Sequence, residues 1–199
     1  FLSVEKQWCC IAPISKTSAF TSISTEGAFD IQVTAQKDLA LEVEGDDNIL
    51  AVVTAEVSHN VLRLRSTKNY SSSEPVKFRI SVPNLEGLSV SGAGHVEIKG
   101  LNNDKFEIDA SGAPSINVSG NTKVVDIDAS GAGKIDTHNL HASRGIVDSK
   151  GVSRIDLDVA DQLDVKISGP SSVYYKGDPQ INKTINGPGK VERRGGEGA

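Results

Sequence analysis

The sequence predicts an all-β fold in which short strands stack as successive coils of a parallel β-solenoid. Three observations carry this prediction: a recurring glycine-containing quartet, apolar residues that alternate on both sides of it, and a composition rich in glycine but poor in aromatic residues. Only 5% of the 199 residues are aromatic, whereas 19 are glycine. This composition suits many short strands joined by tight turns better than a helical bundle.

The quartet recurs at nearly constant spacing. "SGAG" occupies residues 91–94 and returns at 130–133, and related quartets stand between and after these two copies. Aligned on the second residue, the quartets form a ladder with steps of 18 to 20 residues: Gly92, Gly112, Gly131, Gly151, Gly169 and Gly187. The same register returns upstream around Gly27.

Apolar residues alternate on both sides of this ladder. Four residues after each glycine stand Val96, Ile116, Ile135, Ile155, Val173 and Val191. Four residues before stand Leu88, Ile108, Ile127, Val147 and Val165, and then Lys183. Period-two alternation indicates two strands per repeat, each with one buried face. A repeat this short cannot bury its own apolar face, so its neighbours must stack on it, and the residues after the glycines should form one interior column.

The glycine of each quartet is therefore interpreted as a structural corner. Glycine accepts the positive φ that a sharp bend needs, and the small residue beside it lets neighbouring coils approach. A catalytic elbow would need G-x-S-x-G with histidine and carboxylate partners, and a phosphate loop would need G-x-x-x-x-G-K-[ST]. Neither pattern occurs in the sequence.

The region between Gly27 and Gly92 is less regular. It contains three strand-like runs, and its 65-residue spacing predicts three coils with insertions. The runs are Leu39–Val43, Val61–Leu64 and Val76–Val82. A short helix is expected in "DDNILAVVTAEV", after the capping residues Asp46 and Asp47, and an exposed loop is expected at 66–75. We expect three parts in the chain: an N-terminal segment (1–17), one β-solenoid domain (18–194) and a flexible tail (195–199).

Charge and composition exclude several classes of partner. The net charge is −5 and no basic cluster is present, which argues against a nucleic-acid partner. No stretch approaches 18 apolar residues, so no transmembrane span is expected. The first residues, "FLSVEKQWCCIAP", lack the basic start and apolar run of a signal peptide. Cys9 and Cys10 are adjacent and should not bridge each other, which leaves free thiols, modification or bridges between chains.

Several segments together resemble the head GIN domain family of putative auto-transporter adhesins. They are "FTSISTEGAFDIQVT", "LEVEGDDNIL", "LRLRS" and "FRISVPNLEGLSVSGAGHVEI", followed by the repeated turns. The resemblance covers about 20–191. It implies a right-handed parallel β-helix with coils of about 18–20 residues. It also implies export to the periplasm, outer membrane or surface of a bacterium, in a family without an assigned biochemical role.

Outward-facing polar residues should also form columns. Asp109, Asp128 and Asp148 stand three residues before successive glycines, which makes a calcium site conceivable. However, the calcium-binding nonapeptide is missing, and we expect a solvated face without a tightly held metal ion. Acidic and basic columns also follow the glycines, from Glu97 to Asp156 and from Lys134 to Lys190, and predict surface ion pairs of small energetic value. His138 and His141 have metal-ligand spacing only if they are helical, so a corner is favoured.

Two classes of function remain open. A non-catalytic surface or envelope protein with an adhesion or assembly role is favoured, because no set of nucleophile, base and orienting residue converges. The alternative is a carbohydrate-binding or carbohydrate-active β-helix, acting as a lyase or hydrolase. Such proteins usually carry aromatic platforms, whereas the one tryptophan here, Trp8, lies outside the repeats. No cofactor is expected, and an extracellular glycan or protein is the expected ligand.

The ends of the solenoid predict how chains would meet. Toward the C-terminus Lys183 and Arg193 replace apolar column residues and Pro188 follows, which indicates a protected end. The N-terminal residues 1–14 hold apolar side chains and both cysteines. A homo-oligomer or head-to-tail fibre is therefore expected to use this N-terminal segment.

Overall fold

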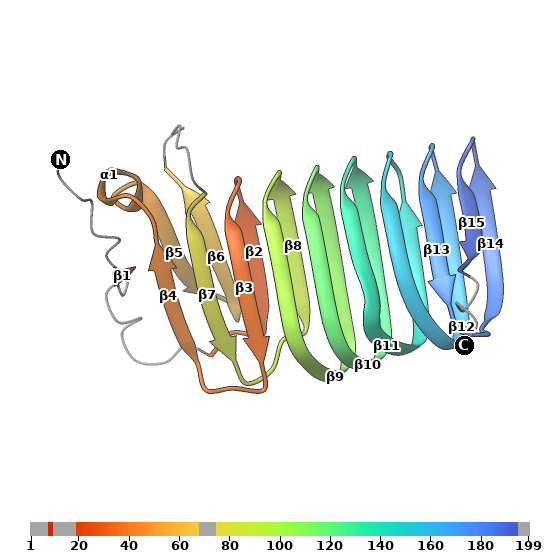
Figure 1. Ribbon diagram of the computed structural model, residues 1–199, viewed down its shortest axis with the longest axis horizontal. Helices are drawn as coiled ribbons and strands as arrows, with labels where there is room; N and C mark the ends of the chain where they lie inside the picture. The colour runs from red at the N-terminus through yellow and green to blue at the C-terminus, as the bar shows by residue number, and fades with distance from the viewer. Residues whose placement is uncertain (1–7, 10–18, 68–74, 195–199) are drawn as a thin grey trace.

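The computed structural model describes residues 8–9, 19–67 and 75–194. Nearly all regular structure in them is β, and the strands follow one another along a single long axis (Figure 1). This confirms the predicted β-solenoid. Most of the expected N-terminal segment, most of the loop at 66–75, and the tail 195–199 lie outside the described residues.

The described residues form fifteen strands and one short helix. In chain order they are β1 (Trp8–Cys9), β2 (Ser22–Glu26), β3 (Asp30–Ala35), β4 (Ala40–Glu44), α1 (Asp47–Leu50), β5 (Val53–Ser58), β6 (Val61–Ser66), β7 (Lys77–Val82), β8 (Gly87–Gly92), β9 (His95–Gly112), β10 (Ser115–Gly131), β11 (Lys134–Ser149), β12 (Arg154–Ser168), β13 (Ser172–Lys176), β14 (Gln180–Asn186) and β15 (Lys190–Arg193).

The strands form two walls that enclose the core. Wall A runs in the order β1, β4, β7, β3, then the first halves of β9 to β12, and ends with β13 and β15. Wall B runs β5, β6, β2, β8, then the second halves of β9 to β12, and ends with β14. Each long strand bends between the two walls and so serves both.

The predicted interior column is confirmed in wall A. Ile116 lies opposite both Val96 and Ile135, and the register continues through Ile155 to Val173. All five side chains are buried, with at most 1% exposed. The upstream register is also confirmed, since Ile31 lies opposite Val96. Identical positions in successive coils therefore meet the same environment, which is why β-branched apolar residues recur there.

The corner glycines allow a close approach between coils. Gly112 has a φ of +90°, in the region that only glycine adopts readily. At Gly131 the constraint is contact, because a Cβ there would lie 2.1 Å from the carbonyl oxygen of Gly112 in the preceding coil. The corner therefore stacks backbone directly on backbone.

The first coils do not stack in chain order. The β2–β3 coil lies between two later coils, since β2 pairs with β6 and β8 while β3 pairs with β7 and β9 (Figure 1). The prediction of three coils with insertions between Gly27 and Gly92 did not include this order of stacking. Beyond β6 and β7 the end is closed by β5 and β4, which pair with them in antiparallel fashion.

The expected helix is much shorter than predicted. It begins at Asp47 as its capping residues indicate, but it ends at Leu50, and the segment from Val53 is strand β5. The β-branched residues of this segment suit a strand, and β5 pairs with β6 through a turn in which His59 and Asn60 have positive φ. The tertiary pairing outweighs local helix propensity here.

Polar residues replace the core at the C-terminal end. Lys183 lies opposite Val165, at a position where the preceding coils carry apolar residues, and Lys183 is exposed. Ile181, Ile185 and Val191 are half-buried against the last complete coil. Among the described residues, no helix is long and apolar enough to span a membrane.

Candidate functional site

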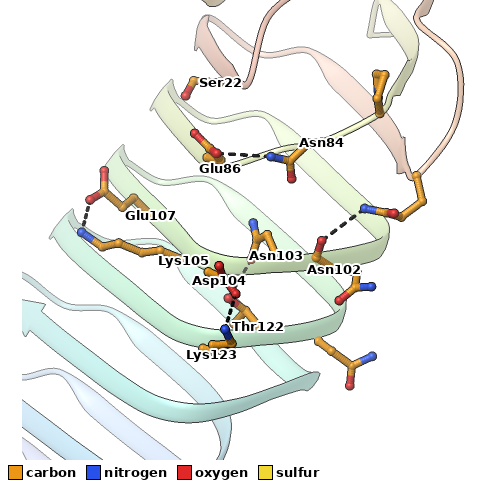
Figure 2. A pocket seen from close by; sticks show the side chains of 13 residues that line it. Ser22, Asn84, Glu86, Asn102, Asn103, Asp104, Lys105, Glu107, Thr122 and Lys123 are labelled. Atoms are coloured by element: carbon orange, nitrogen blue, oxygen red, sulfur yellow. Dashed lines mark hydrogen bonds and ion pairs between the residues drawn. The ribbon is translucent and has the colours of Figure 1, made fainter.

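A polar groove of about 930 Å³ lies at the bend between the two walls, on the side away from the corner glycines. Its lining comes from the start of β2, the end of β3, the β7–β8 connection and the bends of β9 and β10 (Figure 2). Of its thirteen lining residues, Pro83 is the only one with an apolar side chain. We call this the polar groove.

The groove exists because the β2–β3 coil has no bend of its own. The chain enters this coil at Ser22 and leaves it near Gln36, where φ is +63°. The β7–β8 connection passes across the gap, and the backbone N–H of Glu86 donates to the carbonyl oxygen of Thr21 at 2.6 Å. A recess remains between this connection and the complete bends that follow.

Two residues in each neighbouring bend form short polar ladders. Asn121 lies opposite Asn102, and Thr122 lies opposite Asn103, one coil (~4.8 Å) apart. The Thr122 hydroxyl donates to Asn103 Oδ1 at 2.7 Å, and Asn103 Nδ2 donates to the carbonyl oxygen of Leu85 at 2.5 Å. Asn103 is thus held in place. Asn102 and Asn121 are exposed, and their amides make no side-chain hydrogen bond to other described residues.

Four of the five charged residues that line the groove form ion pairs with each other, and the fifth, Glu86, accepts a hydrogen bond from Asn84 Nδ2 at 3.2 Å. Lys105 contacts Glu107, and its ammonium also lies 3.9 Å from Asp126. The hydrogen bond and charge of Glu107 raise the pKa of Lys105 above its usual range. Lys123 Nζ lies 2.7 Å from Asp104. The groove therefore offers many donors and acceptors without a strong field of one sign.

This arrangement suits a ligand rich in hydroxyl groups. A side-chain amide both donates and accepts, so exposed asparagines can each engage two neighbouring hydroxyls. The described lining holds no histidine or cysteine. Its amides, hydroxyls and charged groups can hold a polar molecule.

The aspartates singled out from the sequence lie elsewhere, on the outer face of wall B. Asp128 lies opposite both Asp109 and Asp148, so the three form one column. Lys150 neutralises part of it, with its ammonium 3.3 Å from Asp128 and 3.6 Å from Asp148. Asp128 and then Asp148 raise the pKa of Lys150. No group of three or more potential ligands in the described part of the chain is arranged to hold a metal ion.

The two histidines pair with different carboxylates. His138 contacts Asp136 within β11, and His141 Nδ1 lies 2.6 Å from Asp158 of the next coil. Burial raises the pKa of Asp136, but hydrogen bonds from the His138 ring and backbone outweigh it, so the pKa lies below its usual range. Both histidines lie in β11 where this strand bends between the two walls, because His141 lies opposite Asn121 in the bend of β10. They share no ligand position.

Sequence reasoning missed the groove residues, although a signal was present. Gly100, Gly120 and Gly177 stand eight residues after three of the corner glycines, and all have positive φ. These glycines mark a second set of bends, and the asparagines of the groove follow two of them. Aligning Gly100 with Gly120 leaves Asn102 and Asn121 one position out of register, so the sequence shows that asparagine recurs at these bends but not that the two residues lie opposite each other.

The stacked parallel coils and the lateral groove define the class as a β-solenoid with a polar recess on one side. The chain matches, over residues 19–179, the family described as putative auto-transporter adhesin, head GIN domain. Because this match covers most of the chain, the protein belongs to that family.

Solved structures of bacterial proteins share this fold. A putative adhesin from Bacteroides fragilis is 26% identical, with a TM-score of 0.71, and the match covers 90% of this chain and 94% of that one. A putative lipid binding protein from Parabacteroides distasonis is 18% identical with a TM-score of 0.54, covering 96% of both chains. A putative adhesin from Parabacteroides merdae is 14% identical with a TM-score of 0.52, again covering 96% of both. A search of curated proteins finds no match.

Proposed function

We propose that this protein is an exported, non-catalytic surface protein and that its polar groove binds a neutral glycan. The carrying observation is the exposed pair Asn102 and Asn121, held one coil apart beside a fixed Asn103–Thr122 pair. The adhesin-like family supports a binding role, and the bacterial relatives support a location at or outside the cell envelope.

The rigidity of the groove supports this assignment. Asn103 and Thr122 are tied to each other and to Leu85, so the lining is already ordered before a ligand arrives. A preorganised site loses less conformational entropy on binding. Paired charges also leave no single strong electrostatic preference, which favours a neutral polyhydroxylated ligand over an ionic one.

Glycan-array binding tests the proposal. The double variant Asn102→Ala/Asn121→Ala should lose binding of neutral glycans at least tenfold, because two hydrogen bonds of about 1 kcal/mol each are removed. Asn139→Ala is the matched control, since Asn139 is an exposed asparagine on β11 outside the groove. Equal binding by the wild type and the double variant contradicts the proposal. If the protein releases shortened sugars from the array ligands, the proposal that it is non-catalytic is wrong.

We also propose that chains associate through the N-terminal residues 1–14. The apolar residues and the adjacent cysteines of this segment support the proposal. Light scattering on the protein with and without residues 1–16 tests it. A concentration-dependent oligomer that disappears on truncation is expected, whereas a monomer at high concentration in both forms contradicts it.

A further inference from the structure

A cluster of cations surrounds one tyrosine on the outer face of wall A, near the C-terminal end and apart from the polar groove. The ring centroid of Tyr174 lies 4.9 Å from the guanidinium carbon of Arg154, 5.2 Å from Lys190 Nζ and 5.3 Å from the guanidinium carbon of Arg194. Each contact is within the range of a cation–π interaction. Three cations from separate segments thus share one aromatic partner.

A buried carboxylate lies beneath this cluster. Asp156 lies opposite Tyr174, and its side chain is only 3% exposed, although its sequence pattern predicts a surface ion pair. Arg154 Nε donates to Asp156 Oδ2 at 3.2 Å, and Arg194 Nη2 lies 2.8 Å from Oδ1. Asp156 therefore hydrogen-bonds the Arg154 guanidinium and forms an ion pair with that of Arg194, whose geometry does not make a hydrogen bond to Oδ1.

Both guanidinium groups keep binding capacity toward solvent. The side chains of Arg154 and Arg194 are 50% and 49% exposed. A guanidinium has five N–H donors in a fixed fork, and Asp156 engages only part of each set. Lys190 is balanced by Glu192 at 3.1 Å, so the two arginines and Asp156 leave one positive charge. The cluster is thus a local cationic site on a chain whose net charge is −5.

We propose that this cluster binds carboxylate groups of an acidic, uronate-type polysaccharide. Forked N–H donors match the two oxygens of a carboxylate, and the hydrogen bond to the buried Asp156 fixes the direction of the Arg154 fork before binding. Arg154 lies two coils from Lys190, because Ser172 of the intervening β13 lies opposite both, and two coils span ~9.6 Å along the solenoid axis. This distance is close to the length of two sugar residues along an extended polysaccharide, so alternate carboxylates can meet the two ends of the cluster.

Binding of a galacturonate hexamer, measured by calorimetry at low salt, tests the proposal. The wild type should bind it. Maltohexaose has the same number of sugar residues without the charge, and any heat that it gives should be the same in the wild type and in Arg154→Gln, because neutral glycans are proposed to bind the polar groove. Arg154→Gln and Arg194→Gln should each weaken binding at least tenfold. Arg193→Gln is the matched control because it removes the same charge from the adjacent residue, whose partner is Asp178 at 3.3 Å. An equal loss in Arg193→Gln overturns the proposal.

Asp156→Asn separates an oriented site from simple charge attraction. The substitution makes the cluster more positive, so attraction alone predicts tighter binding, whereas loss of orientation predicts weaker binding. We expect at least fivefold weaker binding, and tighter binding overturns the proposal. Circular dichroism shows whether Asp156→Asn folds. If it does not, the double variant Arg154→Gln/Arg194→Gln is measured instead. Binding of the hexamer by this double variant that equals binding by the wild type overturns the proposal. A hexaglutamate peptide that binds as tightly as the hexagalacturonate overturns the assignment to a polysaccharide.

Discussion

Replacing Gly131 with alanine tests the backbone-on-backbone corner most directly. The new Cβ would lie 2.1 Å from the carbonyl oxygen of Gly112 and 2.8 Å from its nitrogen, whereas real Cβ contacts below 3.0 Å essentially never occur. Both neighbours are backbone atoms, so the two coils must separate by about 1 Å at this corner. That movement also weakens the hydrogen bond from Ala132 N to Gly112 O, now 2.7 Å long.

The magnitude follows from these two losses. Overpacking costs about 1–3 kcal/mol, and a weakened hydrogen bond adds about 1 kcal/mol, so the free energy of unfolding should fall by about 2–4 kcal/mol. For a chain of this size the melting temperature should fall by roughly 5–15 °C.

Chemical and thermal unfolding followed by circular dichroism measures this loss. Gly45→Ala is the control, because its Cβ would first meet a terminal methyl of Leu50 at 3.3 Å, and it should change stability by less than about 1 kcal/mol. If Gly131→Ala unfolds within about 0.5 kcal/mol of the wild type, the close-approach reasoning is wrong.

Three further predictions concern the core, the acid response and the C-terminal end. Ile135→Asp should cost several kcal/mol, because an unpaired carboxylate replaces a fully buried side chain, and a urea midpoint unchanged from wild type refutes this. The pKa of Asp164 lies below its usual range because Asn182 and then Arg144 donate hydrogen bonds to it. The resulting stabilisation is present above the unfolded pKa of about 3.9 and is lost as pH falls through the lower folded value. Asp164→Asn should thus lower the urea midpoint at pH 7 and match the wild type near pH 2; an equal difference at both pH values contradicts this. Lys183→Val should promote association, because an apolar residue would then extend an inner column to an open edge. Light scattering should show oligomers for this variant but not for the outward-facing control Thr184→Val; equal association of both contradicts the reasoning.

The repeating part of the fold could be predicted because each coil places the same position in the same environment. The β-branched residues four positions after each corner glycine are selected by one continuous core, so their spacing alone identifies the column through Ile135. The alternation of apolar and polar residues along a strand shows which face of that strand is buried. It does not show which other strand pairs with it. The pattern around Gly27 is the same whether its coil stands at the end or between two later coils.

The candidate site depends on that missing information. The polar groove forms where the β2–β3 coil interrupts the series of bends, so its position follows from the order of coils and not from any motif. Asn102 and Asn121 look like ordinary turn residues in the sequence. Asp156 was expected at the surface with its neighbours in the acidic column, and its burial follows from the cover that Arg154, Tyr174 and Arg194 provide.

The insertion of the β2–β3 coil also governs how stability is shared along the solenoid. In a simple stacked array, each coil contacts only its two sequence neighbours, so an end can fray without disturbing the rest. Here β2 and β3 hold the block of β4 to β7 against the ladder that begins at β8, and their partners are remote in the chain. Loss of this one coil would leave the two parts joined by the β7–β8 connection. The β2–β3 coil therefore couples the stability of the two parts, so that the block of β4 to β7 and the ladder from β8 onward unfold together. Folding of either part must wait until β2 and β3 have paired with strands that are remote in the chain.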